Sequence, residues 1–235
     1  MIAVAALCAA VVAGAACRGA ARRGEAAHDR HADDLRAYNA AVSTASITLS
    51  LRAKIRGEEL KSRGAVSYRA DGEQLAFTLW GSIPGETMAE LTMTSNRARL
   101  SLPLTGRRLP ETAIASGVAE AVGAEVPLAF FRDLLIGRYP VFDGPAIADR
   151  FDAFRVDDTA SGRREVVTLD EYSFDVRRIA LHSGGREVLV AEYESYGAPI
   201  FAGSPLRAPR SFRIHLPRSK FMISVDFETA SYGAP

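Results

Sequence analysis

The chain has only two cysteines, Cys8 and Cys17, and both lie near its N-terminus. A disulfide or a thiolate metal site needs sulfur at fixed positions in the folded body of a protein. No cysteine follows Cys17, so the body of this chain offers no thiol for either purpose. The role of the two cysteines must therefore be sought in the N-terminal stretch itself.

The histidines and acidic pairs predict neither a catalytic nor a metal centre. His28 and His31 lie three residues apart, but a metal site wants three or four convergent ligands. The acidic residues nearest to them are Asp29, Asp33 and Asp34. The pairs Asp157-Asp158 and Asp170-Glu171 fall where turns are expected, and Asp is favoured in turns by its hydrogen bonds to the backbone. With no phosphate loop or nucleophile elbow either, we expect no enzyme, no cofactor and no metal ion.

The first residues resemble a lipoprotein signal. Residues 2–16 are uncharged and rich in alanine and valine, which is typical of the apolar part of a secretion signal. Such a stretch is shorter than the roughly 20 residues that a membrane-spanning helix needs. Small residues at 14–16 precede Cys17 and resemble the lipobox of bacterial lipoproteins, where the signal is cut before a cysteine that then carries lipid. We expect a signal peptide at 1–16, a lipidated Cys17 and a tether to residue 27.

The charges around this leader leave alternatives open. No Lys or Arg precedes the apolar stretch, whereas Arg18, Arg22 and Arg23 follow it, which is the wrong polarity for an exported signal. A start codon upstream of Met1 would supply the missing basic region. Alternatively, the leader is an anchor that stays uncleaved.

Length and composition fit a globular protein for the remainder, residues 28–235, either as one large β domain or as two small ones. The chain of 235 residues is 48% apolar and 24% charged, and its net charge of +1 argues against a nucleic-acid surface. All-β domains of this size often form one unit. No repeat and no domain boundary is evident, so we expect one domain and no nucleic-acid partner.

Hydrophobic periodicity predicts one helix followed by a long series of strands. Leu35, Tyr38 and Val42 recur at three- and four-residue steps within residues 28–44, the spacing of one helical face. Alternation of apolar and polar residues then predicts about eleven antiparallel strands. These cover 47–55, 66–68, 75–79, 89–93, 98–102, 151–156, 166–169, 174–181, 188–193, 212–216 and 221–227. Two short helices, at 111–123 and 127–137, interrupt the series.

A long sheet covered by so few helices should leave an apolar, concave face incompletely filled. Such a face binds a ligand or a partner. The candidate cavity residues are Leu75, Phe77, Leu79, Leu91, Met93, Leu100, Leu102, Phe130, Phe131, Leu134 and Leu135. Ile83 and Pro84 stand at a hairpin tip, where polar residues are usual, and either touch a membrane or join the core. Trp80 beside them is either partly buried or a contact of the same tip.

Three stretches resemble the LolA/LolB superfamily of lipoprotein carriers. "LAFTLWGSIPGETMAELTM" (75–93) is similar to the family's strand, apolar tip and returning strand, and "EVPLAFFRDLLIGRYP" (125–140) to its proline-led helix. "ASITLSLRAKIRG" and "SRGAVSYRA" fit the opening hairpin. The resemblance covers about residues 35–142 and is nearest to LolB, the outer-membrane lipoprotein-insertion protein. At the tip this chain reads Ile-Pro-Gly where that family prefers Pro-Leu-Gly.

The resemblance implies a mainly β (α+β) fold: an open antiparallel half-barrel with an N-terminal helix and two short helices covering its concave face. It implies a cavity for the acyl chains of lipoproteins or phospholipid, with Ile83 in the place of the protruding apolar residue. It also implies the bacterial cell envelope, at the outer membrane facing the periplasm, and a periplasmic carrier protein as partner.

Three classes of function remain. The first is a membrane-anchored lipid-binding lipoprotein that helps to deliver lipoproteins to the outer membrane. The second is a structural envelope lipoprotein of the same fold, whose concave face binds a protein partner. The third, a hydrolase, would show turnover that depends on one specific Asp or His.

Overall fold

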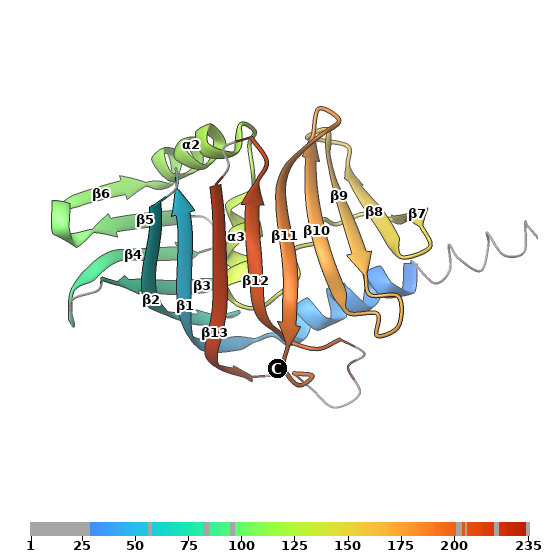
Figure 1. Ribbon diagram of the computed structural model, residues 1–235, viewed down its shortest axis with the longest axis horizontal. Helices are drawn as coiled ribbons and strands as arrows, with labels where there is room; N and C mark the ends of the chain where they lie inside the picture. Colours follow the sequence, from blue (N-terminus) through green and yellow to red (C-terminus); the bar gives the residue numbers. More distant parts are fainter. Residues whose placement is uncertain are drawn as a thin grey trace, which may run out of the picture.

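A computed structural model of the chain describes residues 29–55, 58–81, 85–94, 97–200, 204, 206–218 and 221–233. These residues form one antiparallel sheet of thirteen strands with helices on one of its faces (Figure 1). The strands are β1 (Thr44–Ile55), β2 (Glu58–Arg69), β3 (Gln74–Trp80), β4 (Thr87–Thr94), β5 (Arg97–Leu102), β6 (Arg107–Pro110), β7 (Ala146–Arg150), β8 (Ala153–Asp158), β9 (Arg163–Leu169), β10 (Val176–Ser183), β11 (Arg186–Tyr196), β12 (Pro209–Leu216) and β13 (Phe221–Gly233). The helices are the N-terminal helix (29–41), a 3₁₀ turn η1 (Pro103–Thr105), α2 (Glu111–Val122) and α3 (Leu128–Leu135).

The sheet consists of two meanders joined in the middle. The strand order is β6-β5-β4-β3-β2-β1-β13-β12-β11-β10-β9-β8-β7, so β1 pairs with β13 and the edges are β6 and β7. These two edges do not pair with each other, and the sheet is open. The strand direction turns strongly from one meander to the other in Figure 1, as the right-handed twist of β-strands requires over so many strands.

The predicted mainly β, open antiparallel architecture is confirmed, but the predicted strand number is too low. The two strands that were missed are β6 and β7, the edges of the sheet. Most of their side chains are exposed, so neither carries the apolar alternation that marks a half-buried strand. Arg107 and Arg108 in β6 are instead typical of a protected edge, where charge discourages pairing with another chain.

The core lies between the sheet and the helices and is continuous from the N-terminal helix to β13. Leu35 and Tyr38 of that helix are fully buried, as are Leu134 of α3 and Leu181 of β10. A row of aromatic rings crosses the core, with centroid separations of 5.1, 5.0, 6.1 and 5.8 Å between successive members. Its members are Tyr38, Tyr139, Tyr193, Phe212 and Phe227. Such pairs add directional contacts to the area that they bury.

Hydrogen bonds fasten the N-terminal helix to the segment that follows α3. The side chain of Asn39 donates to the carbonyl of Tyr139 at 2.6 Å and accepts from the Tyr139 N–H at 2.9 Å. Tyr38 donates to the Gly137 carbonyl at 3.1 Å, and Arg138 donates to the Val42 carbonyl at 2.6 Å. The helix is therefore held by specific polar contacts as well as by its apolar face.

We expect Asn39→Ala to lower the free energy of unfolding by about 1–3 kcal/mol, because it leaves a donor and an acceptor of Tyr139 without partners in a half-buried site. Asn39→Asp should also destabilise, since the carboxylate keeps the acceptor but would face the Tyr139 carbonyl. Urea denaturation measures both. Ala40→Ser, at an exposed position of the same helix, is the control, and equal stability of all four proteins would contradict the prediction.

Candidate functional site

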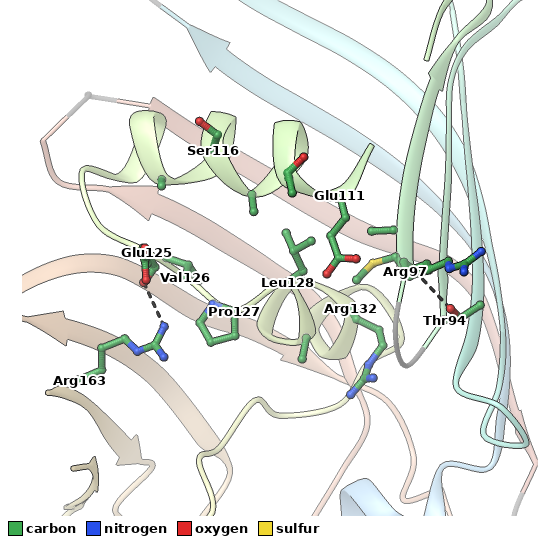
Figure 2. Close-up of a pocket in the computed structure, with 16 residues that line it drawn as sticks. Thr94, Arg97, Glu111, Ser116, Glu125, Val126, Pro127, Leu128, Arg132 and Arg163 are labelled. Atoms are coloured by element: carbon green, nitrogen blue, oxygen red, sulfur yellow. Dashed lines mark hydrogen bonds between the residues drawn. The ribbon is translucent and has the colours of Figure 1, made fainter. Parts of the chain in front are cut away.

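An open groove of about 770 Å³ lies between α2, the start of α3 and the β4–β5 hairpin (Figure 2). Its apolar lining consists of Met93, Ala98, Ala115, Ala119, Val126, Pro127, Leu128 and Ala129. Its polar lining consists of Thr94, Arg97, Glu111, Thr112, Ser116, Glu125, Arg132 and Arg163. The groove is thus amphipathic, with an apolar floor and charges of both signs around it.

Small side chains on α2 keep the groove open. Ala115 and Ala119 stand four residues apart, on one helical face, and both line the groove. Of the residues in α2, Val122 is the one that is buried, near the helix end at Gly123. A helix with larger residues at 115 and 119 would reach across to α3 and fill the space.

Two arginines of the lining are held in place by the protein. Arg132 of α3 bonds to Asp133 and to Glu73, both at 3.1 Å, and its side chain is largely buried. Arg163 of β9 donates to the Glu125 carbonyl at 3.3 Å. Each joins the groove to a distant part of the chain, so the charged part of the lining is fixed before any ligand binds.

Glu111 and Arg97 differ from these two arginines. Within the part of the chain that the structure describes, neither side chain takes part in an ion pair. Glu111, in the first turn of α2, extends toward α3 in Figure 2. Arg97 is exposed at the start of β5. Glu111 is therefore available to a polar group at the groove. The Arg97 side chain instead points away from the groove in Figure 2, because Arg97 alternates with the buried Ala98 along β5.

The predicted cavity residues lie around this groove rather than all within it. Met93 lines it. Leu75, Phe130 and Leu134 are buried in the core. The ones partly buried against that core are Phe77, Leu91, Phe131 and Leu135. Leu79, Leu100 and Leu102 are partly exposed on β3 and β5.

Cross-strand pairing brings several of these residues into one row. Phe77 pairs with Leu91, Leu91 with Leu100, and Leu100 with Leu109 of β6. The neighbouring row is Leu75, Met93 and Ala98. Residues paired in register share a face of the sheet, so the Phe77 row extends the apolar floor that Met93 and Ala98 begin.

Other predicted positions fall elsewhere. Cys17, Ile83 and Pro84 lie outside the described residues. His31 stacks on Phe174, with ring centroids 5.0 Å apart. No group of three His, Cys, Asp or Glu side chains that could hold a metal ion occurs among the described residues, and no helix among them is long and apolar enough to cross a membrane.

Sequence reasoning missed the α2 side of the groove and its charged residues. The signal for α2 was present, because the alanines of "ETAIASGVAEAVG" recur at helical spacing. No comparable signal marks Arg163, which reaches the groove from a strand far along the chain.

A buried carboxyl group lies on the same face of β9 as Arg163. Glu165 is 1% exposed, and one of its oxygens accepts from the Phe142 N–H at 2.5 Å. The other oxygen has no hydrogen-bond partner within the described structure. Burial raises the pKa of Glu165 to about 8, with the Phe142 N–H opposing the rise and the charge of Asp133 adding to it. The side chain is therefore mainly protonated at neutral pH.

This burial predicts a pH dependence of stability. Between about pH 4.5 and 8 the folded protein keeps a proton on Glu165 that the unfolded chain releases, so stability falls as pH rises through this window. One proton contributes a slope of at most about 1.4 kcal/mol per pH unit. Glu165→Gln, which cannot ionise, should flatten the slope.

Denaturation from pH 5 to 8 checks this prediction, with Glu192→Gln at an exposed position of β11 as the control. Parallel slopes for the wild type and Glu165→Gln would show that Glu165 is ionised in the folded state.

Comparison with known proteins relates the fold, and not the sequence, to other chains. No protein family matches the chain, and no curated protein matches it. Among solved structures, a domain from Vibrio parahaemolyticus named for outer membrane lipoprotein sorting is similar, with a TM-score of 0.61 and 10% identity over 88% of this chain and 93% of that one.

Two further structures agree. A LolA superfamily protein from Nitrosomonas europaea gives a TM-score of 0.56 with 12% identity, over 86% of this chain and 93% of that one. A DUF1329 family protein from Desulfovibrio piger gives a TM-score of 0.57 with 12% identity, over 88% of this chain and 92% of that one. At such identities the similarity concerns the fold.

The fold thus defines a class of architecture, an open antiparallel sheet with helices on one face, and this architecture is similar to that of a LolA superfamily protein. The likeness spans both meanders, whereas the sequence resemblance reached only to about residue 142. It does not single out LolB within this class.

Proposed function

We propose that this chain is a non-enzymatic, lipid-binding lipoprotein that holds an acyl chain in the groove between α2, α3 and the β4–β5 hairpin. It is anchored at the outer membrane of a bacterial envelope through a lipidated Cys17. There it accepts acyl chains of lipoproteins, from a periplasmic carrier protein, and helps to deliver them to the membrane.

The amphipathic lining of the groove is the observation that carries this proposal. Its volume of about 770 Å³ lies within the roughly 300–1,000 Å³ typical of ligand sites. Each methylene buried on the floor contributes about 0.8 kcal/mol. The charged part of the lining, in which Glu111 takes part in no ion pair of the described structure, suits the polar end of the same molecule. An acyl chain with a polar end matches both parts.

The similar structures add support from their printed names, which refer to lipoprotein sorting and to the LolA superfamily. They share the fold with this chain, and a fold alone does not fix a function. The proposal therefore depends on the groove, with the fold as context. The cavity residues expected from the sequence, including the Phe77 row, extend the proposed binding surface, and Ile83 with Pro84 remains the proposed membrane-contact tip.

One observation favours a structural lipoprotein that binds a protein partner. Beneath β8–β12 the inner face of the sheet is packed with buried residues, among them Phe154, Ile179, Leu189 and Phe212. That half of the molecule leaves little room for lipid. Native mass spectrometry of the full chain distinguishes the two functions: co-purified lipid supports the carrier, and a lipid-free protein supports the alternative.

Partly filling the groove should weaken lipid binding while leaving the fold intact. We expect the double variant Ala115→Leu/Ala119→Leu to bind a fluorescent fatty acid about tenfold more weakly, because displacing two methylenes forfeits about 1.6 kcal/mol. Fluorescence titration measures this change. The matched control is Ala113→Leu/Ala121→Leu, which adds the same atoms at exposed positions of α2 outside the groove. Equal affinities of the two double variants would place the lipid elsewhere.

Anchoring is tested by the two cysteines. Cys17→Ser should move the protein from the membrane fraction to the soluble fraction of the envelope, because it removes the lipid attachment point. Cys8→Ser, within the expected signal peptide, should leave fractionation unchanged. If both variants fractionate alike, the anchor does not depend on Cys17.

A further inference from the structure

Three aromatic residues project from two adjacent turns at the β7–β10 end of the sheet. Phe151, in the β7–β8 turn, is 83% exposed, and Tyr172, in the β9–β10 turn, is 87% exposed. Phe174, in the same turn as Tyr172, is 47% exposed. Turns usually carry small or polar residues. We call these three residues the aromatic turn patch.

The two turns lie side by side. The Leu169 N–H, at the end of β9, donates to the carbonyl of Asp152 at 2.8 Å, which joins the turn after β9 to the turn before β8. The ring of Phe174 stacks on His31 in the first turns of the N-terminal helix. The patch therefore stands where this helix begins, at the same end of the sheet in Figure 1.

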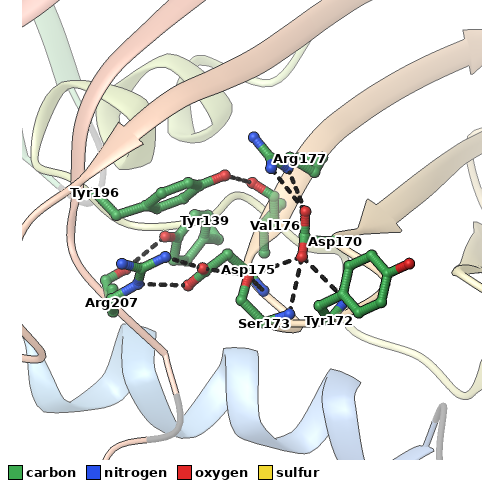
Figure 3. Close-up of polar contacts among 9 residues, drawn as sticks. All are labelled: Tyr139, Asp170, Tyr172, Ser173, Asp175, Val176, Arg177, Tyr196 and Arg207. Atoms are coloured by element: carbon green, nitrogen blue, oxygen red, sulfur yellow. Dashed lines mark hydrogen bonds and ion pairs between the residues drawn. The ribbon is translucent and has the colours of Figure 1, made fainter.

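The β9–β10 turn is built to hold its aromatic residues outward. The Asp170 carboxylate accepts from the backbone N–H groups of Ser173 at 2.8 Å and Tyr172 at 3.0 Å, and from Arg177 at 2.7 and 2.9 Å (Figure 3). These hydrogen bonds, that of the Ser173 N–H first, lower the pKa of Asp170. The carboxylate therefore stays charged, and the turn stays fixed, across the physiological range.

Phe174 and Tyr172 differ in how they are presented. Phe174 has a φ of +58°, a conformation that costs energy for a bulky residue and that Gly or Asn would adopt more easily. The Tyr172 ring points away from the polar cluster in Figure 3, and no hydrogen bond of its hydroxyl to a described residue is found. The chain thus accepts an unfavourable backbone and exposed apolar surface at a rigid turn, which indicates a contact surface.

We propose that the aromatic turn patch docks on the surface of a phospholipid bilayer. Tyrosine prefers the interface between headgroups and acyl chains, where its apolar ring and polar hydroxyl are both accommodated, and phenylalanine adds apolar area that enters the acyl boundary. Arg150 flanks Phe151 with a side chain that is 63% exposed, and it lies 3.9 Å from the Asp152 carboxylate, so polar groups border the rings as they do in a headgroup layer. A bilayer explains why two separate turns each carry an exposed aromatic residue.

The position of the N-terminal segment is the reason for choosing a membrane as the partner of the aromatic turn patch. The apolar leader and Cys17 precede the helix that begins beside the patch. A fully extended chain from Cys17 to residue 29 spans at most about 40 Å, so an anchored protein keeps this end of the sheet close to the membrane. The choice of a bilayer rests on the anchoring part of the proposed function, and not on the groove.

Collisional quenching tests which end of the molecule contacts lipid. Tyr172→Trp and, as matched control, Leu104→Trp are made in the full chain with Trp80→Phe, so that one indole reports. Leu104 is 60% exposed in η1, next to the opposite edge strand β6. With phosphatidylethanolamine–phosphatidylglycerol vesicles that contain brominated lipid, we expect quenching of Trp at 172 and not at 104. Absent or equal quenching at the two positions would overturn the proposal.

Vesicle co-sedimentation gives the second measurement. We expect Phe151→Ser/Tyr172→Ser to lower partitioning to the same vesicles by about tenfold or more, because two exposed rings are lost. Leu60→Ser/Leu104→Ser removes two apolar side chains elsewhere and should leave partitioning unchanged.

Equal partitioning of both double variants would contradict bilayer docking and assign the patch to a protein partner instead. The vesicle measurements use protein without lipid on Cys17. Their result therefore does not depend on the fractionation of the Cys17→Ser variant or on the fatty-acid titration. A failure of the patch is therefore distinguishable from a failure of the proposed function.

Discussion

The pairing of β1 with β13 holds the two meanders of the sheet together. Eleven residue pairs join these strands, from Thr44 opposite Gly233 to Lys54 opposite Met222. Without this ladder the described strands would form two separate antiparallel sheets, one of β1–β6 and one of β7–β13. The partners lie more than 150 positions apart in sequence, so the chain must close nearly its whole length before this ladder can form.

Joining the meanders has different consequences for the two halves. The N-terminal helix packs over the junction and the C-terminal meander, and the aromatic row from Tyr38 to Phe227 fills the space beneath. The N-terminal meander is covered by α2 and α3, and the residues of α2 that face the groove include alanines. The groove thus lies in the half covered by α2 and α3, whereas large side chains pack against the sheet in the other half.

Most of the architecture could be predicted from the sequence, because strands with one buried face alternate in the sequence itself. The edge strands β6 and β7 were not predicted, because strands that are exposed on both faces do not alternate between apolar and polar residues. The site was harder to predict. A groove forms where side chains are too small to fill the space, and the small size of Ala115 and Ala119 has this effect only because α2 is placed near α3. The apolar residues of the strands and of α3 were identified from their pattern, but the pattern does not say which of them line the groove: Leu75 of β3 and Phe130 and Leu134 of α3 are buried in the core.

The small side chains of α2 that leave the groove open also affect how a bound ligand is released. A protein that gains about 0.8 kcal/mol for every methylene it holds must have a way to expose its ligand again. α2 fully buries Val122 alone, and its Ile114 and Val118 pack partly buried against the core, so moving α2 exposes fewer apolar side chains than moving α3 would. Elements with few buried contacts open at the lowest free-energy cost, and binding sites draw on them for that reason. α3, by contrast, is secured by Phe130, Leu134 and the Arg132 ion pairs. Opening the groove through α2 would therefore leave α3, the floor and the sheet in place.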